Sequence, residues 1–178
     1  MNLPTDKKYS IIYADPGWQY KDKANAGKRG AEHKYKCMSV QDICDLPVKD
    51  ITAENAILFL WVTKPFIFEA EKVIKAWGFE YKTNGFTWIK KNKIADSFFW
   101  GMGNWTRSNP EDCLLAVKGK PKRLSAKVHS VVYSPIRAHS QKPDEVRDKI
   151  VQLVGDLPRI ELFSRQRAPG WDRWGNEV

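Results

Sequence analysis

The sequence predicts an α/β domain in which a parallel or mixed sheet is covered by helices. Short apolar runs typical of buried strands alternate along the chain with segments of helical periodicity. Residues 56–62 are apolar without alternation, which is typical of a strand covered on both faces. The 178 residues, 42% of them hydrophobic and 29% charged, suffice for a sizeable core, so we expect one domain over residues 1–178.

The first strand is expected over residues 10–14, and it ends in the turn Asp15-Pro16-Gly17-Trp18. In an α/β sheet, ligands bind beyond the carboxyl ends of the strands. The turn places a carboxylate, a backbone carbonyl and an aromatic ring at such an end, so these four residues are candidate catalytic residues. Pro-Gly is also a common turn dipeptide, and the alternative is an ordinary turn with Trp18 in the core.

A basic loop without helical or strand periodicity follows over about residues 20–37. A loop of this length inside a compact domain is usually functional or disordered. Its candidate substrate contacts are Lys21, Arg29, His33 and Tyr35, and the alternative for His33 and Tyr35 is an ordinary surface residue.

Capping and periodicity predict the elements that follow. Ser39 and Asp42 fit a capping box that opens a short helix ending at residue 46. Apolar residues at helical spacing predict a second helix over 65–77, which Gly78 ends. Further strands are expected over residues 56–62, 86–89, 113–117, 131–133 and 160–163, and a third helix over 143–154.

Two loops between the later strands are candidate substrate-binding segments. The loop over about residues 97–110 is rich in Gly and Trp and is suited to lie over a ligand. The basic loop over about 118–130 either follows a nucleic-acid backbone or is a solvated turn. The phosphate-binding patterns GxGxxG and GxxxxGK[ST] are absent, so a nucleoside triphosphate site has no support. The candidate contacts in these loops are Trp105, Arg107, Lys120 and Lys122.

The C-terminal part of the chain carries further charged candidates. Lys142 precedes the third helix, near an N-terminus whose backbone N–H groups favour anions, and the alternative is a plain capping loop. Glu161 lies inside the last predicted strand, and Arg165 and Asn176 follow it in a polar, Trp-rich segment. A segment this close to the terminus normally frays, and its charged groups indicate a ligand-binding edge instead.

The chain has a formal net charge of +9 and contains eight Trp, eight Phe and six Tyr residues. Basic surface attracts phosphates and aromatic rings stack on bases, so nucleic acid is a candidate partner beside a merely solvated surface. No apolar run is long enough for a bilayer and the N-terminus has no apolar signal core, so we expect a cytoplasmic protein. Three scattered cysteines without a CxxC pair predict no metal site. The sequence does not predict the oligomeric state.

In order along the chain, these motifs resemble those of the MT-A70-like family of adenine methyltransferases. The turn after the first strand is similar to the family's Asp-Pro-Pro-Trp box, with Gly17 where the family usually has a second proline. The other matching segments extend over nearly the whole chain: His33-x-Tyr35-x-x-Met38, Leu58-Phe59-Leu60-Trp61, Trp77-Gly78-Phe79, Phe86-x-Trp88-x-Lys90, Gly101-x-Gly103-x-Trp105-x-Arg107, Cys113-Leu114-Leu115, Lys118-Gly119, His139-Ser140-x-Lys142-Pro143-Asp144-Glu145, Glu161-Leu162-Phe163-x-Arg165 and Gly170-Trp171-x-x-Trp174-Gly175-Asn176.

The resemblance implies a Rossmann-like class I methyltransferase fold in permuted order, with a mixed, mostly parallel sheet and helices on both faces. It also implies S-adenosylmethionine as the methyl donor. By position, Lys142 resembles the partner of the methionine carboxylate, and Asp15 lies near the methionine amino group. The residues that resemble nucleoside contacts are Arg165, Asn176, Glu161 and Glu177.

The implied reaction is methyl transfer to the 6-amino nitrogen of adenine in nucleic acid. Asp15 and the Pro16 carbonyl would accept the two N–H groups of the amine, while Trp18 would stack on the base. We expect DNA as the substrate because small free-standing chains of this type resemble prokaryotic or phage-borne enzymes. The alternatives are an RNA adenine methyltransferase, a catalytically silent nucleic-acid-binding subunit, and methylation of a protein amide or small amine. Gly17 is expected to reduce rigidity without abolishing activity.

Overall fold

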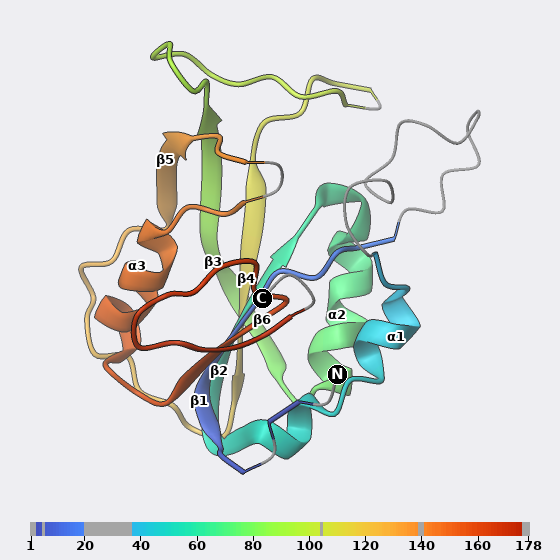
Figure 1. Ribbon diagram of the computed structural model, residues 1–178, viewed down its shortest axis with the longest axis vertical. Helices are drawn as coiled ribbons and strands as arrows, with labels where there is room; N and C mark the ends of the chain where they lie inside the picture. The colour runs from blue at the N-terminus through green and yellow to red at the C-terminus, as the bar shows by residue number, and fades with distance from the viewer. Residues whose placement is uncertain (1–2, 5, 20–36, 104, 139–140, 176–178) are drawn as a thin grey trace.

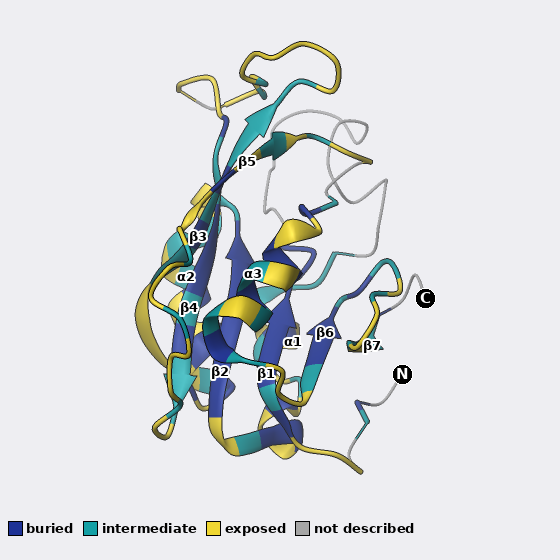
Figure 2. Cartoon of the chain, turned by 90° about the vertical axis from the view of Figure 1, so that its left-hand side faces the viewer, coloured by how far each residue is buried: buried dark blue, intermediate teal, exposed yellow. Residues whose placement is uncertain are grey.

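The computed structural model describes residues 3–4, 6–19, 37–103, 105–138 and 141–175 of the chain. One sheet lies between helices: α1 (Val40–Cys44) and α2 (Ile67–Ala76) cover one face, and α3 (Glu145–Val154) covers the other (Figure 1). The middle strands are buried, whereas the loops beyond them are exposed (Figure 2). The predicted α/β class with helices on both faces is therefore confirmed. Over these described ranges, no helix has the length and apolar character needed to cross a membrane.

Within the described residues the sheet has seven strands: β1 (Tyr9–Ala14), β2 (Thr52–Val62), β3 (Glu80–Lys91), β4 (Glu111–Lys118), β5 (Val131–Pro135), β6 (Arg159–Leu162) and β7 (Asp172–Trp174). Their order across the sheet is β5-β3-β4-β2-β1-β6-β7. β1 is parallel to β2 and β6, β3 is parallel to β5, and β6 is parallel to β7. Only β4 runs antiparallel to its neighbours in this set, so the sheet is mixed and mostly parallel, as predicted.

The register of β4 decides which residues lie beside the end of β1. The last residue of β2 pairs with Asp112, near the start of β4, whereas Ala56 pairs with Lys118 at the other end. Because β2 runs parallel to β1, Glu111 lies at the same end of the sheet as Asp15. The basic segment that follows Lys118 therefore begins at the opposite end.

β1 lies at the centre of two hydrophobic clusters, one on each face of the sheet. Ile12 and Ala14 pack on the side of α1 and α2, and Ile11 and Tyr13 pack on the side of α3. All four side chains are almost completely buried. A strand packed on both faces in this way has little freedom to move. The residue that follows it, Asp15, is therefore held in a defined place.

The helix termini follow the predicted capping signals. The Ser39 hydroxyl accepts a hydrogen bond from the Asp42 N–H at 3.1 Å, and the Asp42 carboxylate accepts one from the Ser39 N–H at 3.3 Å. This confirms the capping box, although α1 ends at Cys44 rather than at residue 46. Gly78 has a φ of 82°, which favours glycine, and it ends α2 as predicted. Two short 3₁₀ turns complete the helical segments: η2 (Val48–Ile51) and η3 (Lys64–Phe66).

The C-terminal strands differ from the prediction. β6 spans Arg159–Leu162 rather than residues 160–163, because Phe163 leaves the strand with a φ of 62°. The segment predicted as a ligand-binding edge contains an additional short edge strand, β7, whose Trp174 carbonyl accepts a hydrogen bond from the Ser164 N–H at 3.0 Å. The Trp174 ring also packs on Phe163, with ring centroids 5.4 Å apart. Three residues are too few to show a strand pattern in the sequence.

Candidate active site

The turn after β1 is held on both sides by backbone hydrogen bonds. On one side, the Asp15 N–H donates to the carbonyl of Leu162 in β6 at 3.4 Å. On the other side, the Gly17 carbonyl accepts from the Met38 N–H at 2.8 Å, and the Gln19 N–H donates to the Met38 carbonyl at 3.1 Å. The turn therefore joins the last parallel strands to the segment that leads into α1.

Trp18 lies in the hydrophobic core and is only 4% exposed. Its indole N–H donates to the Trp61 carbonyl at 3.1 Å, and its ring stacks on Phe66 with centroids 5.4 Å apart. One face of the ring is thus already occupied by a neighbouring aromatic ring. In this structure the Trp18 ring anchors the turn, because apolar burial and a satisfied N–H favour the core position. Its stacking on a substrate base stays a prediction.

Four side chains of alternating charge form an ion-pair chain at this end of the sheet. The Lys142 ammonium lies 2.9 Å from the Asp15 carboxylate and 3.2 Å from the Glu111 carboxylate. Glu111 also pairs with the ammonium of Lys90 at 2.5 Å. The Lys142 ammonium lies over the Trp61 ring, 5.5 Å from its centroid. We call Asp15, Lys142, Glu111 and Lys90 the charge chain.

Burial and mutual attraction set the ionisation of the charge chain. Burial raises the pKa of Asp15 above its usual value of 3.8, and the Lys142 ammonium opposes this rise. Burial acts in the same direction on Glu111, but the ammonium groups of Lys142 and Lys90 outweigh it and lower its pKa to about 2. The two carboxylates likewise outweigh burial for Lys142 and raise its pKa above 10.5. Lys142 and Glu111 are therefore charged at neutral pH.

Glu161, predicted as a nucleoside contact, is buried in an ion pair with Arg147 of α3. The Arg147 guanidinium donates to both Glu161 carboxylate oxygens at 2.8 Å, and it donates a third hydrogen bond to Asp144 at 2.8 Å. Both Glu161 oxygens are thus already engaged. Arg165 is half-buried, and its charge, like that of Lys142, opposes the rise in the Asp15 pKa that burial causes. The structure therefore brings Asp15, Lys142, Glu161 and Arg165 to one end of the sheet.

A groove of about 1530 Å³ opens beside the charge chain. It is lined by residues of α1, by residues 63–66 with Glu69 and Lys72, and by residues 102–103 and 105–111. Lys90 and Glu111 belong both to the charge chain and to the groove lining. These two residues connect the groove with Asp15 through Lys142.

Trp105 and Arg107, two predicted substrate contacts, line this groove. Trp105 is 96% exposed, so its ring is open for contact with a ligand. The loop that carries them is anchored by Asn109, whose side-chain amide accepts from the Lys90 N–H at 3.0 Å and donates to the Lys90 carbonyl at 2.9 Å. The substrate role of Trp105 and Arg107 stays a prediction, but their place at the groove agrees with it.

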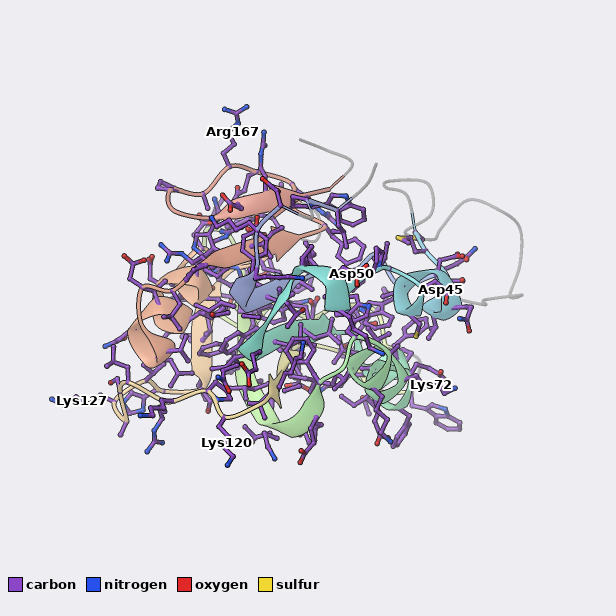
Figure 3. The ribbon with its side chains drawn as sticks, turned by 90° about the horizontal axis from the view of Figure 1, so that it is seen from below. Asp45, Asp50, Lys72, Lys120, Lys127 and Arg167 are labelled. Atoms are coloured by element: carbon purple, nitrogen blue, oxygen red, sulfur yellow. The ribbon has the colours of Figure 1, made fainter. Side chains whose placement is uncertain are left out.

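Lys120 and Lys122, two further predicted substrate contacts, lie away from this site, and their substrate role stays a prediction. They follow the end of β4, which the register places at the opposite end of the sheet from Asp15. The Lys120 N–H donates to the Asn55 side chain at 2.7 Å, and Figure 3 shows the Lys120 side chain projecting outward at that end. The basic composition of this loop predicted nucleic-acid contact, but composition carries no information on strand direction.

Several predicted site residues lie outside the part of the chain that the structure describes. They are Lys21, Arg29, His33, Tyr35, Asn176 and Glu177, together with most of the predicted basic loop over about 20–37. Their roles stay predictions. Conversely, the sequence analysis gave no role to Glu111, Lys90, Asn109 or Arg147. Glu111, Lys90 and Asn109 become visible as parts of the site only once the pairing of β4 with β2 and β3 is known, and Arg147 only once α3 is placed beside β6.

The Asp15–Lys142 pair suits a ligand that carries both an ammonium and a carboxylate group. When the pair opens, Lys142 can bind the ligand carboxylate and Asp15 the ligand ammonium, with no change in the net charge of the site. Glu111 still balances Lys142 from the other side. In the described ranges, His, Cys, Asp and Glu side chains form no group of three or more that could hold a metal ion.

Comparison with known proteins gives a consistent family assignment. The family model described as MT-A70 matches residues 9–177. The chain is 34% identical to the type II methyltransferase M.MunI of a Mycoplasma species, over 97% of this chain and 78% of that protein. It is 30% identical to an N(6)-adenosine-methyltransferase MT-A70-like protein of Drosophila melanogaster, over 96% of this chain and 27% of that protein. It is 27% identical to the human N(6)-adenosine-methyltransferase catalytic subunit METTL3, over 96% of this chain and 28% of that protein.

Proposed function

We propose, from the premise that this chain belongs to the MT-A70 family, that it transfers a methyl group from S-adenosylmethionine to the 6-amino nitrogen of adenine in DNA. The family and the methyltransferase relatives make the chain an adenine-specific methyltransferase, and such relatives imply the use of S-adenosylmethionine. Our proposal adds the residues that perform the reaction and the choice of DNA.

The observation that carries the proposal is the Asp15–Lys142 pair at the end of β1, joined through Glu111 to the groove. The methionine end of S-adenosylmethionine carries both an ammonium and a carboxylate, which match Asp15 and Lys142. Arg165, Asn176, Glu161 and Glu177 are our candidates for contacts with its nucleoside. When bound, S-adenosylmethionine supplies an electrophilic methyl group on a positively charged sulfur.

Asp15 and the Pro16 carbonyl act on the adenine amine. The lone pair of the 6-amino nitrogen is delocalised into the ring, so the free amine is a poor nucleophile. When these two oxygens accept its N–H groups, the nitrogen becomes more tetrahedral and its lone pair is available for in-line attack on the methyl carbon, whose bond to sulfur would break. The methylated nitrogen would then lose one N–H proton to solvent. The same oxygens stabilise the positive charge that develops on nitrogen, and each such group contributes about 10²–10³-fold in rate. The Asp15 carboxylate must be ionised for this role, and the Lys142 charge favours that state.

DNA is our proposed substrate because of how much of each relative the chain covers. It covers 78% of a type II methyltransferase, a designation that we take to indicate DNA modification. It covers little more than a quarter of each of the two N(6)-adenosine-methyltransferases. The net charge of +9 is compatible with any polynucleotide and does not distinguish between them.

The test is methyl transfer from radiolabelled S-adenosylmethionine to duplex DNA, single-stranded DNA and RNA, followed by nucleoside analysis. We expect labelled N6-methyladenine from DNA, and loss of the label with D15N. The matched control is D50N, because Asp50 is an exposed acid at the opposite end of the sheet (Figure 3). Label in RNA alone would overturn the choice of DNA. S-adenosylmethionine binding without transfer to any of the three would instead identify a silent subunit.

A further inference from the structure

Three aromatic side chains meet at the surface beyond the end of β3. Phe98 lies with its ring centroid 5.9 Å from that of Trp100 and 5.9 Å from that of Tyr133. Their exposed fractions are 50%, 54% and 46%. We call these three residues the aromatic cluster. They lie outside both hydrophobic core clusters of the described structure, so core packing does not account for their contacts.

Backbone hydrogen bonds hold the aromatic cluster in place. The segment pairs back on β3 through a bridge between Lys91 and Phe98. The Phe99 N–H donates to the Lys90 carbonyl at 2.9 Å, and the Asn92 side chain donates to the Phe98 carbonyl at 3.2 Å. Tyr133 belongs to β5 and pairs with Ile89 of β3. The rings are thus presented to solvent by a fixed backbone, which is the arrangement expected of a binding surface.

The charges around the aromatic cluster favour an anionic partner. Residues 89–108 contain four cationic residues; Lys91 pairs with Asp96 and Lys90 with Glu111, whereas Lys93 and Arg107 are exposed and in no ion pair of the described structure. The Lys91 ammonium lies over the Tyr133 ring, 4.7 Å from its centroid. Aromatic rings interleaved with cations are the arrangement by which proteins bind single-stranded nucleic acid, because the rings stack on bases and the cations attract phosphates. A second copy of this chain would bring the same cations against this surface and be repelled.

The cluster and the groove share one loop. Met102, Trp105 and Arg107 line the groove, and Phe98 and Trp100 precede them in the same connection between β3 and β4. This connection lies beyond the carboxyl end of β3 (Figure 1), the end of the sheet at which Asp15 also lies. An adenine placed for methylation must leave a duplex stack or come from a single strand, so its neighbours are unstacked. The aromatic cluster is therefore placed to bind bases beside the target.

We propose that the aromatic cluster stacks on unpaired bases that flank the target adenine, a role that rests on the proposed function and names a second contact surface for its substrate. The first measurement is the affinity of a fluorescein-labelled single-stranded DNA oligonucleotide, by anisotropy, which requires no methyl transfer. The variant F98A/W100A is expected to bind about tenfold or more weakly. W100F, which keeps a stacking ring, is expected to stay within about twofold of the unmodified chain.

The matched control is L124A, because Leu124 is an apolar side chain, 74% exposed, in the basic loop at the opposite end of the sheet. Its oligonucleotide affinity is expected not to change. The affinity of F98A/W100A for S-adenosylmethionine is also expected not to change, because the ring contacts of the cluster are with one another and with Lys91 rather than with Asp15 or Lys142. In methylation assays F98A/W100A should have a higher KM for DNA than the unmodified chain, with kcat nearly unchanged.

An abasic nucleotide beside the target adenine provides the sharpest comparison. The unmodified chain should bind this DNA as weakly as F98A/W100A binds the intact strand. The affinity of F98A/W100A itself should be the same for the abasic and the intact DNA. Equal affinity of variant and unmodified chain for intact DNA would overturn this inference while leaving adenine methylation untouched. A dimer that F98A/W100A converts to monomers, with DNA affinity retained, would also overturn it and assign the cluster to self-association. Failure of the unmodified chain to methylate any polynucleotide would count against the proposed function alone.

Discussion

Both ends of the sheet carry charged side chains, but the two ends use them differently. At the end of β1, Asp15, Lys142 and Glu111 are largely buried and paired with one another. At the other end, the cations of the basic loop beyond β4 (Lys120, Lys122, Arg123 and Lys127) are exposed, and within the described structure none of them is in an ion pair. A buried paired charge is fixed in place and leaves an uncompensated partner when removed, whereas an exposed charge is screened. Pairing and strand direction, rather than the number of cations, therefore locate the site.

Of the variants that test this difference between the two ends of the sheet, K142M is expected to have the largest effect, a fall in the free energy of unfolding. Removal of the ammonium leaves the buried Asp15 carboxylate without its ion-pair partner, whereas Glu111 keeps its pair with Lys90. Breaking a buried pair in this way costs about 3–5 kcal/mol of unfolding free energy. Urea denaturation of K142M and of K120M measures the difference, and K120M is expected to stay within about 0.5 kcal/mol of the parent chain. Similar losses for both variants would break the comparison.

Acid should destabilise the fold through Glu111. In the unfolded chain this carboxyl binds a proton near its ordinary pKa of 4.5, but in the folded chain only near about 2. The unfolded state therefore binds more protons between these values, and the stabilisation by Glu111 is lost as the pH falls from 4.5 toward 2. Urea midpoints measured across this range should fall less steeply for E111Q than for the parent chain. Parallel curves for the two proteins would show that the Lys142–Glu111–Lys90 pairing does not stabilise the fold.

The variant G17P tests how rigidly the turn after β1 is held. Gly17 does not have a positive φ, so its backbone conformation does not require glycine. Proline at a compatible position stabilises by about 0.4–1 kcal/mol, because it restricts the unfolded chain. We expect the thermal midpoint to rise slightly and methylation to be retained. A large loss of stability would mean that the Gly17 backbone has a conformation that proline cannot adopt.

The smallest effect is expected at the opposite end of the sheet. The double variant K120A/K122A removes two exposed cations far from Asp15. Exposed charges contribute only general attraction, so kcat should not change and KM for DNA should change by no more than about threefold at moderate salt. Steady-state methylation at two salt concentrations provides the measurement. A fall in kcat would place these lysines at the site and contradict the assignment made from the register of β4.

Much of the fold follows from local signals, whereas the site depends on pairing. The capping box at Ser39, the helix stop at Gly78 and the apolar run in β2 each have a cause within a few residues, and each was predicted. β4 also has a recognisable apolar run, but nothing in that run shows that it is antiparallel. That direction places Glu111 beside Lys142 and takes Lys120 away from the site.

Trp18 shows a second limit of the sequence. A tryptophan next to a catalytic motif is equally compatible with stacking on a base and with packing in the core. The core position of Trp18 depends on its stacking with Phe66 and on its hydrogen bond to the Trp61 carbonyl, and both residues are distant in sequence. The aromatic cluster is a similar case, because Tyr133 reaches Phe98 only through the pairing of β5 with β3.

The central claim is that the Asp15 carboxylate activates the adenine amine, and single-turnover methyl transfer by D15N at saturating S-adenosylmethionine tests it most directly. Saturation removes any effect of weaker cofactor binding, and D50N provides the matched control. The account predicts a transfer rate at least about 10²-fold below that of the parent chain, with D50N unchanged. A D15N rate within about twofold of the parent chain would contradict it.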